Sequence, residues 1–306
     1  MNPTLLTPFE NYLTDRDRSL VTIKGYKSDM AYFASWFESR NAETFSPQAV
    51  TTSDVREYRQ HLQMVERLKA TTINRRLAAL SAYMDWAVQT GQIDKNPRGK
   101  IKSVRLEEAS AQALDRHQQY ALQRAIEKDL QYAAKAYPRR KVSRQRDASL
   151  VIFLLNTGLR LSELLAMQFS DLELTDRKGL VIVRKGKGNR ERTVPLNADA
   201  RRAMQDWLAV RPERDTPFIW MAVEDDSESL TPRSVQRIFS RYGQEAGIPG
   251  FHPHIARHTF AKNLVDRGVG LEKVARLLGH TSLNTTRIYV APNERDLELA
   301  VDELSQ

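Results

Sequence analysis

The sequence predicts a mainly α-helical protein with one small antiparallel β-sheet, divided into two domains. Its 306 residues suffice for two domains of ordinary size. Apolar residues recur at helical spacing through the first hundred residues, whereas two short β-rich runs flank a glycine-rich turn near residue 188. We therefore expect a helical domain over residues 1–97, a basic linker over 98–113, and an α-rich domain over 114–306 that contains the sheet.

The first domain is expected to contain helices only. Between Ser19 and Phe37 the apolar residues are spaced three and four apart, which places them on one face of a helix. Ser53 and Asp54 offer a cap for the helix that follows them. The expected elements are an amphipathic stretch at Leu5–Leu13, helices at Ser19–Phe37 and Val55–Leu62, and a long helix that Thr71-Thr72 opens and Gly91 and Asn96-Pro97 close.

A change in composition marks the linker, where Arg98, Lys100, Lys102 and Arg105 lie among few large apolar residues. A solvated connector would have this composition, but its charge also suits a segment that lies along phosphates.

The second domain combines helices with a hairpin. Helical patterns cover residues 116–135 and 147–156, with a basic stretch at 139–146 between them. Leu180–Arg184 and Arg192–Leu196 are β-rich runs around a loop of glycine and asparagine, which is typical of a hairpin. We expect a third strand at Phe218–Trp220, a solvated acidic loop at 224–226, and helices from Thr231-Pro232 to the end.

The charge balance favours a polyanionic partner. Lysine and arginine total 47 against 38 acidic residues, which gives a net charge of +9. Such an excess suits nucleic acid or an acidic membrane surface, although an ordinary basic protein can also carry it. There is no cysteine, so disulfides and thiolate chemistry are excluded. No signal segment and no apolar run of membrane-spanning length is evident, and we expect a cytoplasmic protein.

Six residues in the second half of the chain could form a phosphate site. They are Arg160 in T-G-L-R-L-S-E, Lys187 in G-K-G-N, His254 and Arg257 in H-P-H-I-A-R-H, His280 in L-G-H, and Tyr289 in T-R-I-Y-V. Two guanidiniums that converge on one phosphate would stabilise its non-bridging oxygens.

Each of these residues also has an ordinary structural interpretation. Arg160 could simply pair with Glu163. The sequence pattern predicts equal exposure for Lys185 and Lys187, so it does not choose between them. His280 could cap a helix that ends at Gly279, and a helical tyrosine such as Tyr289 is more often a core residue. A phenol with a pKa of about 10 becomes a nucleophile only where cations stabilise the phenolate.

A metal site at His254 and His258 is the alternative that we reject. Histidines four residues apart resemble half of a zinc site. Arg257 between them places a fixed positive charge where a cation would bind, and the motif contains no glutamate to act as a base. The arrangement suits an anion instead.

Taken together, these motifs resemble those of the tyrosine recombinases, the phage-integrase and Xer-like family of site-specific DNA recombinases. T-G-L-R-L-S-E, G-K-G-N-R-E-R-T-V-P-L, H-I-A-R-H-T-F-A, L-G-H and the downstream tyrosine occur in the family's order. The N-terminal segments around Tyr26 and Asn74 resemble the family's core-DNA-binding domain. The resemblance therefore covers nearly the whole chain.

The resemblance implies a role for each residue. Arg160 and Arg257 would bind the scissile phosphate, and His280 would hold one of its oxygens. Tyr289 would form a 3′-phosphotyrosyl intermediate, with His254 assisting proton transfer from it. Lys187, rather than Lys185, would protonate the leaving 5′ oxygen, and Glu163 would support the site. No cofactor and no metal is implied.

The family also implies partners. The expected substrate is a short inverted-repeat DNA site, recombined through a Holliday junction by a homotetramer, with a partner recombinase or accessory protein left open. The reaction would serve integration or excision, or the resolution of a mobile element or replicon dimer. An apolar stripe in the tail from Glu294 could pack on its own domain, but the family implies that it docks into a neighbouring protomer. Compared with the family, Ala256 replaces a common leucine, and residues 131–146 suggest an added DNA-contacting loop.

Basic and polar side chains on predicted helices are the candidates for DNA contact. They are Lys24, Lys27, Lys69, Thr71, Thr72, Asn74, Arg75 and Arg76 in the first domain, and Arg233, Arg237 and Arg241, spaced four apart, in the second. A solvated face would show the same pattern. Two other functions remain open: relaxation of DNA by a type IB topoisomerase-like reaction, and a non-catalytic DNA-binding accessory protein.

Overall fold

The computed structural model of the chain describes residues 6–99, 101–105, 112–184, 191–223 and 229–280. The chain divides into two compact units, Met1–Glu108 and Ala109–Gln306. The division falls inside the 98–113 segment that the sequence assigns to a linker. Among the described residues, no helix combines the length and the apolar character needed to cross a membrane.

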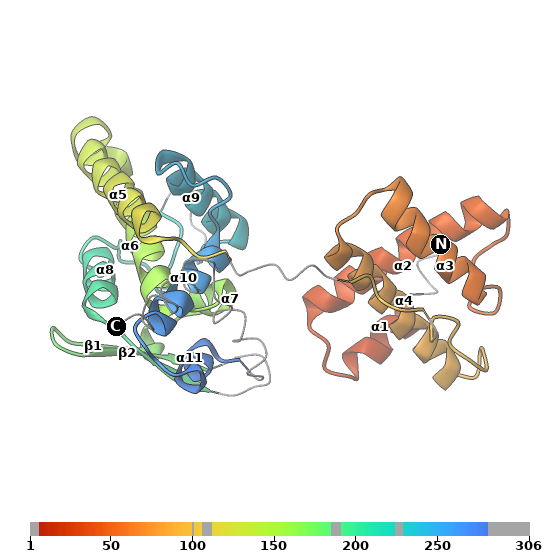
Figure 1. Ribbon diagram of the computed structural model, residues 1–306. Coiled ribbons are helices and arrows are strands. Elements are labelled where there is room, and N and C mark those ends of the chain that lie inside the picture. The colour runs from red at the N-terminus through yellow and green to blue at the C-terminus, as the bar shows by residue number, and fades with distance from the viewer. Residues whose placement is uncertain (1–5, 100, 106–111, 185–190, 224–228, 281–306) are drawn as a thin grey trace, which may run out of the picture. The chain divides into compact units, whose positions relative to one another are not determined.

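The first unit is a bundle of helices around an aromatic core (Figure 1). Phe33 lies at its centre, with its ring 4.8 Å from that of Tyr58 in an edge-to-face contact, an arrangement that aromatic pairs favour. The elements are α1 (Thr7–Thr14), α2 (Leu20–Asn41), α3 (Thr52–Gln60) with a π-helical turn at His61–Val65, and α4 (Ala70–Gln89).

Helix starts in this unit follow from capping chemistry. Ser19 caps α2 by accepting a hydrogen bond from the backbone N–H of Thr22. The predicted cap of α3 at Ser53-Asp54 is wrong by two residues. Thr51 is the cap, and Asp54 completes a capping box by accepting from the Thr51 backbone N–H at 2.8 Å. A Thr-Thr-Ser-Asp run offers several caps, and the reciprocal bond selects Thr51.

The segment that begins the expected linker packs on the first unit. Ile101 and Val104 lie against its hydrophobic core. The Asn74 side chain donates to the Val104 carbonyl and accepts from the Val104 N–H, both at 2.8 Å. Residues up to Val104 are therefore part of the unit rather than a solvated connector.

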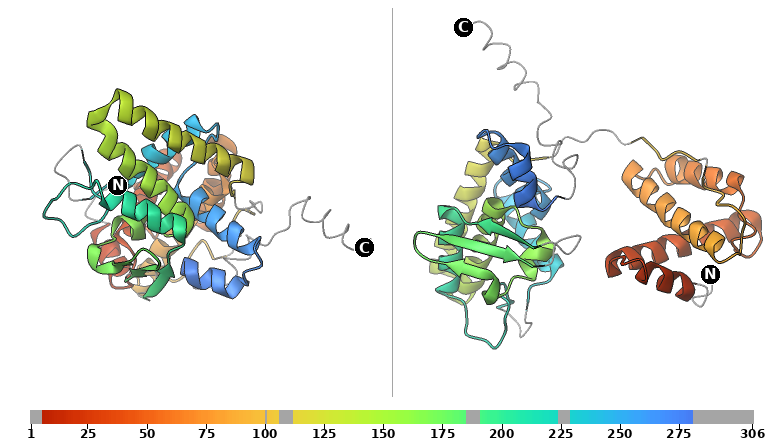
Figure 2. Two further views of the ribbon diagram at one scale, coloured as in Figure 1. Left: turned by 90° about the vertical axis from the view of Figure 1, so that its left-hand side faces the viewer. Right: turned by 90° about the horizontal axis from the view of Figure 1, so that it is seen from below.

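Figures 1 and 2 show the helices of the second unit beside its small sheet. Its described residues form seven helices, which share a core that includes Trp207 and Trp220. Helix α5 packs on α6, and α6 packs in turn on α10. The helices are α5 (Arg116–Ala136), α6 (Lys141–Thr157), α7 (Leu161–Leu165), α8 (Ala198–Leu208), α9 (Pro232–Glu245), α10 (Pro253–Val265) and α11 (Leu271–Leu278), with 3₁₀ turns at Pro138–Arg140 and Phe169–Asp171.

The sheet has three antiparallel strands in the order β1-β2-β3. The predicted hairpin is confirmed as β2 (Gly179–Val183) and β3 (Arg192–Pro195), with Val181 opposite Val194. The predicted third strand at Phe218–Trp220 is wrong. The third strand is β1 (Leu172–Leu174), and Phe218 makes only an isolated bridge with Gln168. The apolar run of Ile219 and Trp220 is buried in the helical core instead.

The basic stretch at 139–146 is a helix start, not an added loop. It forms the 3₁₀ turn and the first turns of α6, and Arg146 is buried against Asp147, with an Nη2–Oδ1 distance of 2.8 Å. Arg144 lies 3.6 Å from Asp129 of α5. The Arg144–Asp129 pair joins α6 to α5, whereas the Arg146–Asp147 pair lies within α6. The predicted fold class, helices with one small antiparallel sheet, is confirmed.

Candidate active site

Arg160 owes its position to a sharp turn at the end of α6. Gly158 ends that helix with a φ of +62°, a conformation that glycine adopts without strain. After this turn, Arg160 is the N-cap residue of α7. Its guanidinium donates to Glu163 Oε1 at 2.8 Å and to the Gly279 carbonyl at 2.8 Å.

Arg257 reaches the same place from α10. It is buried, and its two terminal nitrogens donate to the carbonyls of Gly158 and Leu278, each at 2.6 Å. The two predicted phosphate-binding arginines therefore both lie where the C-terminal ends of α6 and α11 meet. Carbonyl oxygens orient both guanidiniums, and Arg160 in addition shares the Glu163 carboxylate.

A third arginine, Arg192 at the start of β3, was not among the predicted residues. It forms a two-pronged ion pair with Glu163, at 2.9 Å to Oε1 and 2.6 Å to Oε2, and its Nε donates to the Leu277 carbonyl at 2.9 Å. The R-E-R run after the glycine-rich loop is the sequence signal that could have indicated it. Arginine suits this position because its planar fork matches a carboxylate.

Glu163 is the carboxylate that these arginines share. Its side chain is only 3% exposed, and burial alone would raise its pKa. Hydrogen bonds from Arg192, from the Arg160 backbone and from the Arg160 side chain outweigh burial and hold the pKa of Glu163 below its usual value. Glu163 is therefore ionised at neutral pH.

Two of the predicted histidines lie within electrostatic reach of the arginine pair. Burial, followed by the charges of Arg257, Arg160 and Arg192, lowers the pKa of His280 to about 4. Burial also lowers the pKa of His254, with further contributions from His252, Arg257 and Arg160. Both imidazoles are consequently neutral at pH 7, with one ring nitrogen of each unprotonated.

The end of α11 is the point on which the arginines converge. Arg192, Arg257 and Arg160 donate respectively to the carbonyls of residues 277, 278 and 279, which are consecutive. The last carbonyls of a helix have no partner within it, and the helix dipole places negative charge there. Gly279 then turns with a φ of +65° and places His280 beside the guanidiniums.

The structure thus brings together Arg160, His254, Arg257, His280 and Glu163. Lys187 and Tyr289 lie outside the described residues, as do the acidic run 224–226 and the C-terminal tail. Nowhere in the described part of the chain do three or more carboxylate or histidine side chains gather as metal ligands.

The candidates for DNA contact divide into exposed and engaged side chains. Lys24, Lys69, Thr71, Arg233 and Arg237 are exposed, and Thr72 is half-buried. The engaged ones are Lys27 with Glu10, Asn74 with Val104, Arg75 with Asp29, Arg76 with Glu66 and Tyr32, and Arg241 with Asp147 and Asp129. Arg241 therefore belongs to the ion pairs that join α9 to α5 and α6.

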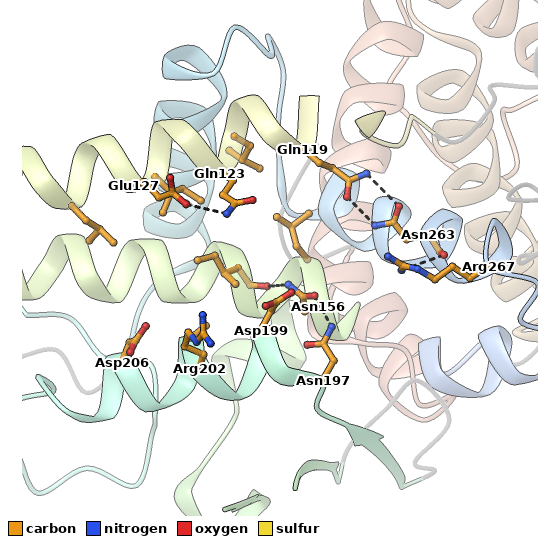
Figure 3. Close-up of a pocket in the computed structure, with 16 residues that line it drawn as sticks. Gln119, Gln123, Glu127, Asn156, Asn197, Asp199, Arg202, Asp206, Asn263 and Arg267 are labelled. Carbon is orange, nitrogen blue, oxygen red and sulfur yellow. Dashed lines mark hydrogen bonds between the residues drawn. The ribbon is translucent and has the colours of Figure 1, made fainter. Parts of the chain in front are cut away.

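A separate cavity of about 530 Å³ lies between α5, α6 and α8 (Figure 3). Its lining combines apolar side chains such as Leu122 and Ile126 with amides, among them Asn156 and Asn263. Arginines at its rim are accompanied by Glu127, Asp199 and Asp206. None of the predicted catalytic residues that the structure describes lines it, and its mixed charge does not suit a phosphate.

Comparison with known proteins matches both units. The pattern of the Phage integrase family covers residues 114–296, and that of the phage integrase N-terminal SAM-like domain covers residues 6–91. The chain is 31% identical to the tyrosine recombinase XerC of Corynebacterium glutamicum, over 92% of this chain and 85% of that one. It is 30% identical to the tyrosine recombinase XerA of Pyrococcus furiosus, over 97% and 93%.

Solved structures share the fold. XerH site-specific recombinase bound to its difH substrate superposes with a TM-score of 0.71 at 23% identity, covering 94% of this chain and 80% of that one. The Tn1549 transposon integrase in complex with transposon right end DNA gives a TM-score of 0.72 at 20% identity, covering 97% and 98%. By sequence over nearly its whole length, the chain belongs to the phage integrase family, the tyrosine-type site-specific DNA recombinases.

Proposed function

We propose that the protein cleaves and rejoins DNA strands at a specific duplex site, with Tyr289 as its nucleophile. The observation that carries this proposal is the pair of guanidiniums, Arg160 and Arg257, held by main-chain carbonyls beside the neutral imidazole of His280. Such a pair binds the two non-bridging oxygens of one phosphate.

The charge at the site suits the reaction. Arg160, Arg192 and Arg257 supply three positive charges, and Glu163 supplies one negative charge. A phosphodiester carries one negative charge and gains a second when the tyrosine oxygen adds to phosphorus as a phenolate. Fixed positive charge in a partly buried site stabilises this developing charge more than water does.

Proton transfer completes the cleavage step. The Tyr289 oxygen bonds to phosphorus while the phosphorus–O5′ bond breaks, and the product is a 3′-phosphotyrosyl ester and a 5′-hydroxyl. In this proposal His254 accepts the phenol proton, and its lowered pKa keeps it available as a base at neutral pH. Lys187 supplies the proton to the leaving 5′ oxygen.

Rejoining reverses the same chemistry with a different strand. The phosphotyrosyl ester retains the energy of the broken phosphodiester, so a 5′-hydroxyl from a partner duplex can attack it without a cofactor. Exchange of one strand pair gives a Holliday junction, and exchange of the second pair resolves it. We assign this assembly to four copies of the chain, linked through the tail after Glu294.

The proposed DNA contacts use the exposed basic residues of both units. Lys24 and Lys69 in the first unit and Arg233 and Arg237 on α9 are accessible to phosphates. We assign the first unit to core-site binding and the second to catalysis. Affinity that depends on such contacts falls steeply as salt rises. We also assign the proposed activity to the cytoplasm.

Covalent capture tests the nucleophile and identifies the target sequence in one experiment. The wild-type protein is incubated with a pool of nicked duplexes of randomised sequence, in which cleavage releases a short fragment and prevents rejoining. We expect a DNA–protein adduct that survives detergent and heat, and sequencing of the captured DNA gives the site. Tyr289→Phe should bind the selected site and form no adduct. An adduct that persists in Tyr289→Phe refutes the proposed nucleophile.

The selected site then separates recombination from its alternatives. Two duplexes of different length that carry the site should yield recombinants of new length. Relaxation of supercoiled plasmid without recombinants would support a topoisomerase-like activity instead. Binding without any adduct from the wild-type protein would indicate a non-catalytic accessory protein.

A further inference from the structure

Arg192 combines burial with complete use of its donor nitrogens. Its side chain is 9% exposed. Nη1 and Nη2 donate hydrogen bonds to the two carboxylate oxygens of Glu163, and Nε donates to the Leu277 carbonyl. Both terminal nitrogens of Arg192 are paired with a carboxylate, whereas those of Arg257 donate to main-chain carbonyls, so Arg192 has less positive charge left to offer a phosphate. Arg192 is therefore placed to organise the site rather than to contact the substrate.

The groups that Arg192 holds are those that orient the arginine pair. Glu163 accepts from the Arg160 backbone N–H and from the Arg160 guanidinium, both at 2.8 Å. Leu277 lies in the last turn of α11, three residues before His280. A single side chain thus connects the anchor of Arg160 to the helix end that presents His280.

The turn at Gly279 is shaped around this arginine. A Cβ atom built on Gly279 would lie 2.8 Å from Arg192 Nη1 and 2.9 Å from its Cζ. Carbon and nitrogen do not approach so closely without displacement of one of them. Any side chain at residue 279 would therefore push Arg192 off Glu163 or move the His280 turn.

We propose that Arg192 is a positioning residue for strand cleavage, which holds Glu163 and the end of α11 together so that Arg160 and His280 face one phosphate. This inference rests on the proposed function. Without the fork of Arg192, the buried Glu163 carboxylate has only Arg160 as an ionic partner among the described residues. It would then draw the Arg160 guanidinium towards itself and away from the substrate.

Lysine cannot replace this arrangement. A lysine ammonium is a compact point charge that can bind one carboxylate oxygen. It cannot bind both oxygens of Glu163 and the Leu277 carbonyl at once in a fixed geometry. Arg192→Lys therefore keeps the charge and removes the orientation. A misplaced catalytic group costs roughly 10- to 100-fold in rate.

The test is single-turnover cleavage of a nicked duplex that carries the captured site, with protein in excess over DNA. The plateau rate constant at saturating protein reports the chemical step, and the half-saturating protein concentration reports binding and the folded fraction. We expect Arg192→Lys to lower the plateau rate constant on the order of 10- to 100-fold and to leave half-saturation within about twofold. A merely structural defect would raise half-saturation and leave the plateau unchanged.

Arg184→Lys is the matched control. Arg184 follows β2 at the other side of the same hairpin and pairs with Asp171, but its side chain is 55% exposed and it does not touch Glu163. We expect its plateau rate constant to equal that of the wild type. An equal loss in both variants would assign the effect to the hairpin in general and overturn the role of Arg192.

A double-mutant cycle asks whether Arg192 acts through Glu163. If it does, Arg192→Lys in a Glu163→Gln background should cause little further loss, because the carboxylate that it orients is gone. If the fold-loss in the double variant equals the product of the losses in the two single variants, Arg192 does not act through Glu163. Gly279→Ala provides a second perturbation that leaves Arg192 chemically intact, and we expect a comparable fall in plateau rate. Its control is Gly268→Ala, where φ is +76° and no atom lies within 4 Å of the added Cβ.

The outcomes distinguish this inference from the proposed function. If the wild-type protein forms no adduct, the proposed function is refuted and the inference falls with it. If the wild-type protein cleaves and Arg192→Lys has the same plateau rate constant, only the inference is refuted.

Discussion

Gly158 offers a direct test of how the turn after α6 builds the site. Its φ of +62° lies in the left-handed region, and a Cβ there would lie 2.9 Å from Cε1 and 3.0 Å from Cγ of the Phe260 ring. Gly158→Ala therefore meets two costs. Left-handed backbone costs a non-glycine residue about 1–2 kcal/mol, and forcing an extra carbon into a packed contact adds about 1–3 kcal/mol.

Gly268→Ala separates these costs. Gly268 has a φ of +76° and open space around its added Cβ, so it bears only the backbone cost. We expect Gly158→Ala to lower the free energy of unfolding by about 2–5 kcal/mol and Gly268→Ala by about 1–2 kcal/mol. For a unit of this size each kcal/mol lowers Tm by about 2–4 °C.

Urea and thermal unfolding of the full chain measure the difference. Phe260→Leu replaces the rigid ring that meets the added Cβ with a smaller side chain that can rotate away from it, and it should restore part of the stability of Gly158→Ala. Because the Gly158 carbonyl anchors Arg257, the plateau rate of adduct formation should also fall in Gly158→Ala and recover with Phe260→Leu. Equal destabilisation by the two glycine substitutions, or no recovery in the double variant, would refute this account of the turn.

Two further predictions follow from the electrostatics. The pKa of His280 is lowered to about 4 in the folded protein, against about 6.5 in an unfolded chain, so unfolding takes up a proton between these values and stability falls as pH drops from about 6.5 to 4. Unfolding free energies measured across this range should depend less steeply on pH in His280→Asn, and an unchanged slope would contradict the shift. Arg237→Ala should weaken DNA binding and reduce its salt slope by about one, whereas Arg241→Ala, which breaks the 3.1 Å pair with Asp147, should instead lower stability by about 1–3 kcal/mol. Salt titrations of binding together with urea unfolding distinguish the two, and interchanged effects would contradict the structure.

The sequence predicted those elements whose signal is local. Helical spacing located α2, α4 and α5, and a glycine-rich turn between β-rich runs located the hairpin. The third strand was misplaced because β1 has only three residues, too few to show alternation. Phe218–Trp220 has the composition of a strand, yet Ile219 and Trp220 are buried in the core between the helices. Local composition cannot reveal this, because it depends on packing against residues far away in the sequence.

The fate of the basic residues depended on carboxylates that are distant in sequence. Arg241 and Arg237 have the same pattern on one helix, but Arg241 meets Asp147, which lies 94 residues away. Arg75 meets Asp29 across the first unit in the same way. A stripe of arginines therefore predicts positive charge on a helix, and only the fold decides which members remain exposed for DNA.

At the candidate site, the sequence indicated the arginine pair and Glu163 but not what orients them. The partners of the three arginines include four main-chain carbonyls, which every residue carries and no motif can reveal. Arg192 was missed for the same reason, since its role exists only where β3 meets the end of α11. L-G-H predicted the turn correctly, because a glycine in the left-handed conformation is a local requirement.

The use of carbonyls has a chemical consequence. An arginine that is held by a carboxylate is oriented but largely neutralised, whereas one that is held by a carbonyl keeps its charge for a substrate. Arg257 is held by two carbonyls, Arg160 by one carbonyl and a shared carboxylate, and Arg192 takes the larger part of that carboxylate. Arg192 therefore spares Arg160 from full neutralisation by Glu163. A buried glutamate is therefore compatible with an anion site, because Arg192 takes most of its charge. For the same reason, loss of Arg192 should weaken catalysis even though no atom of Arg192 need touch the DNA.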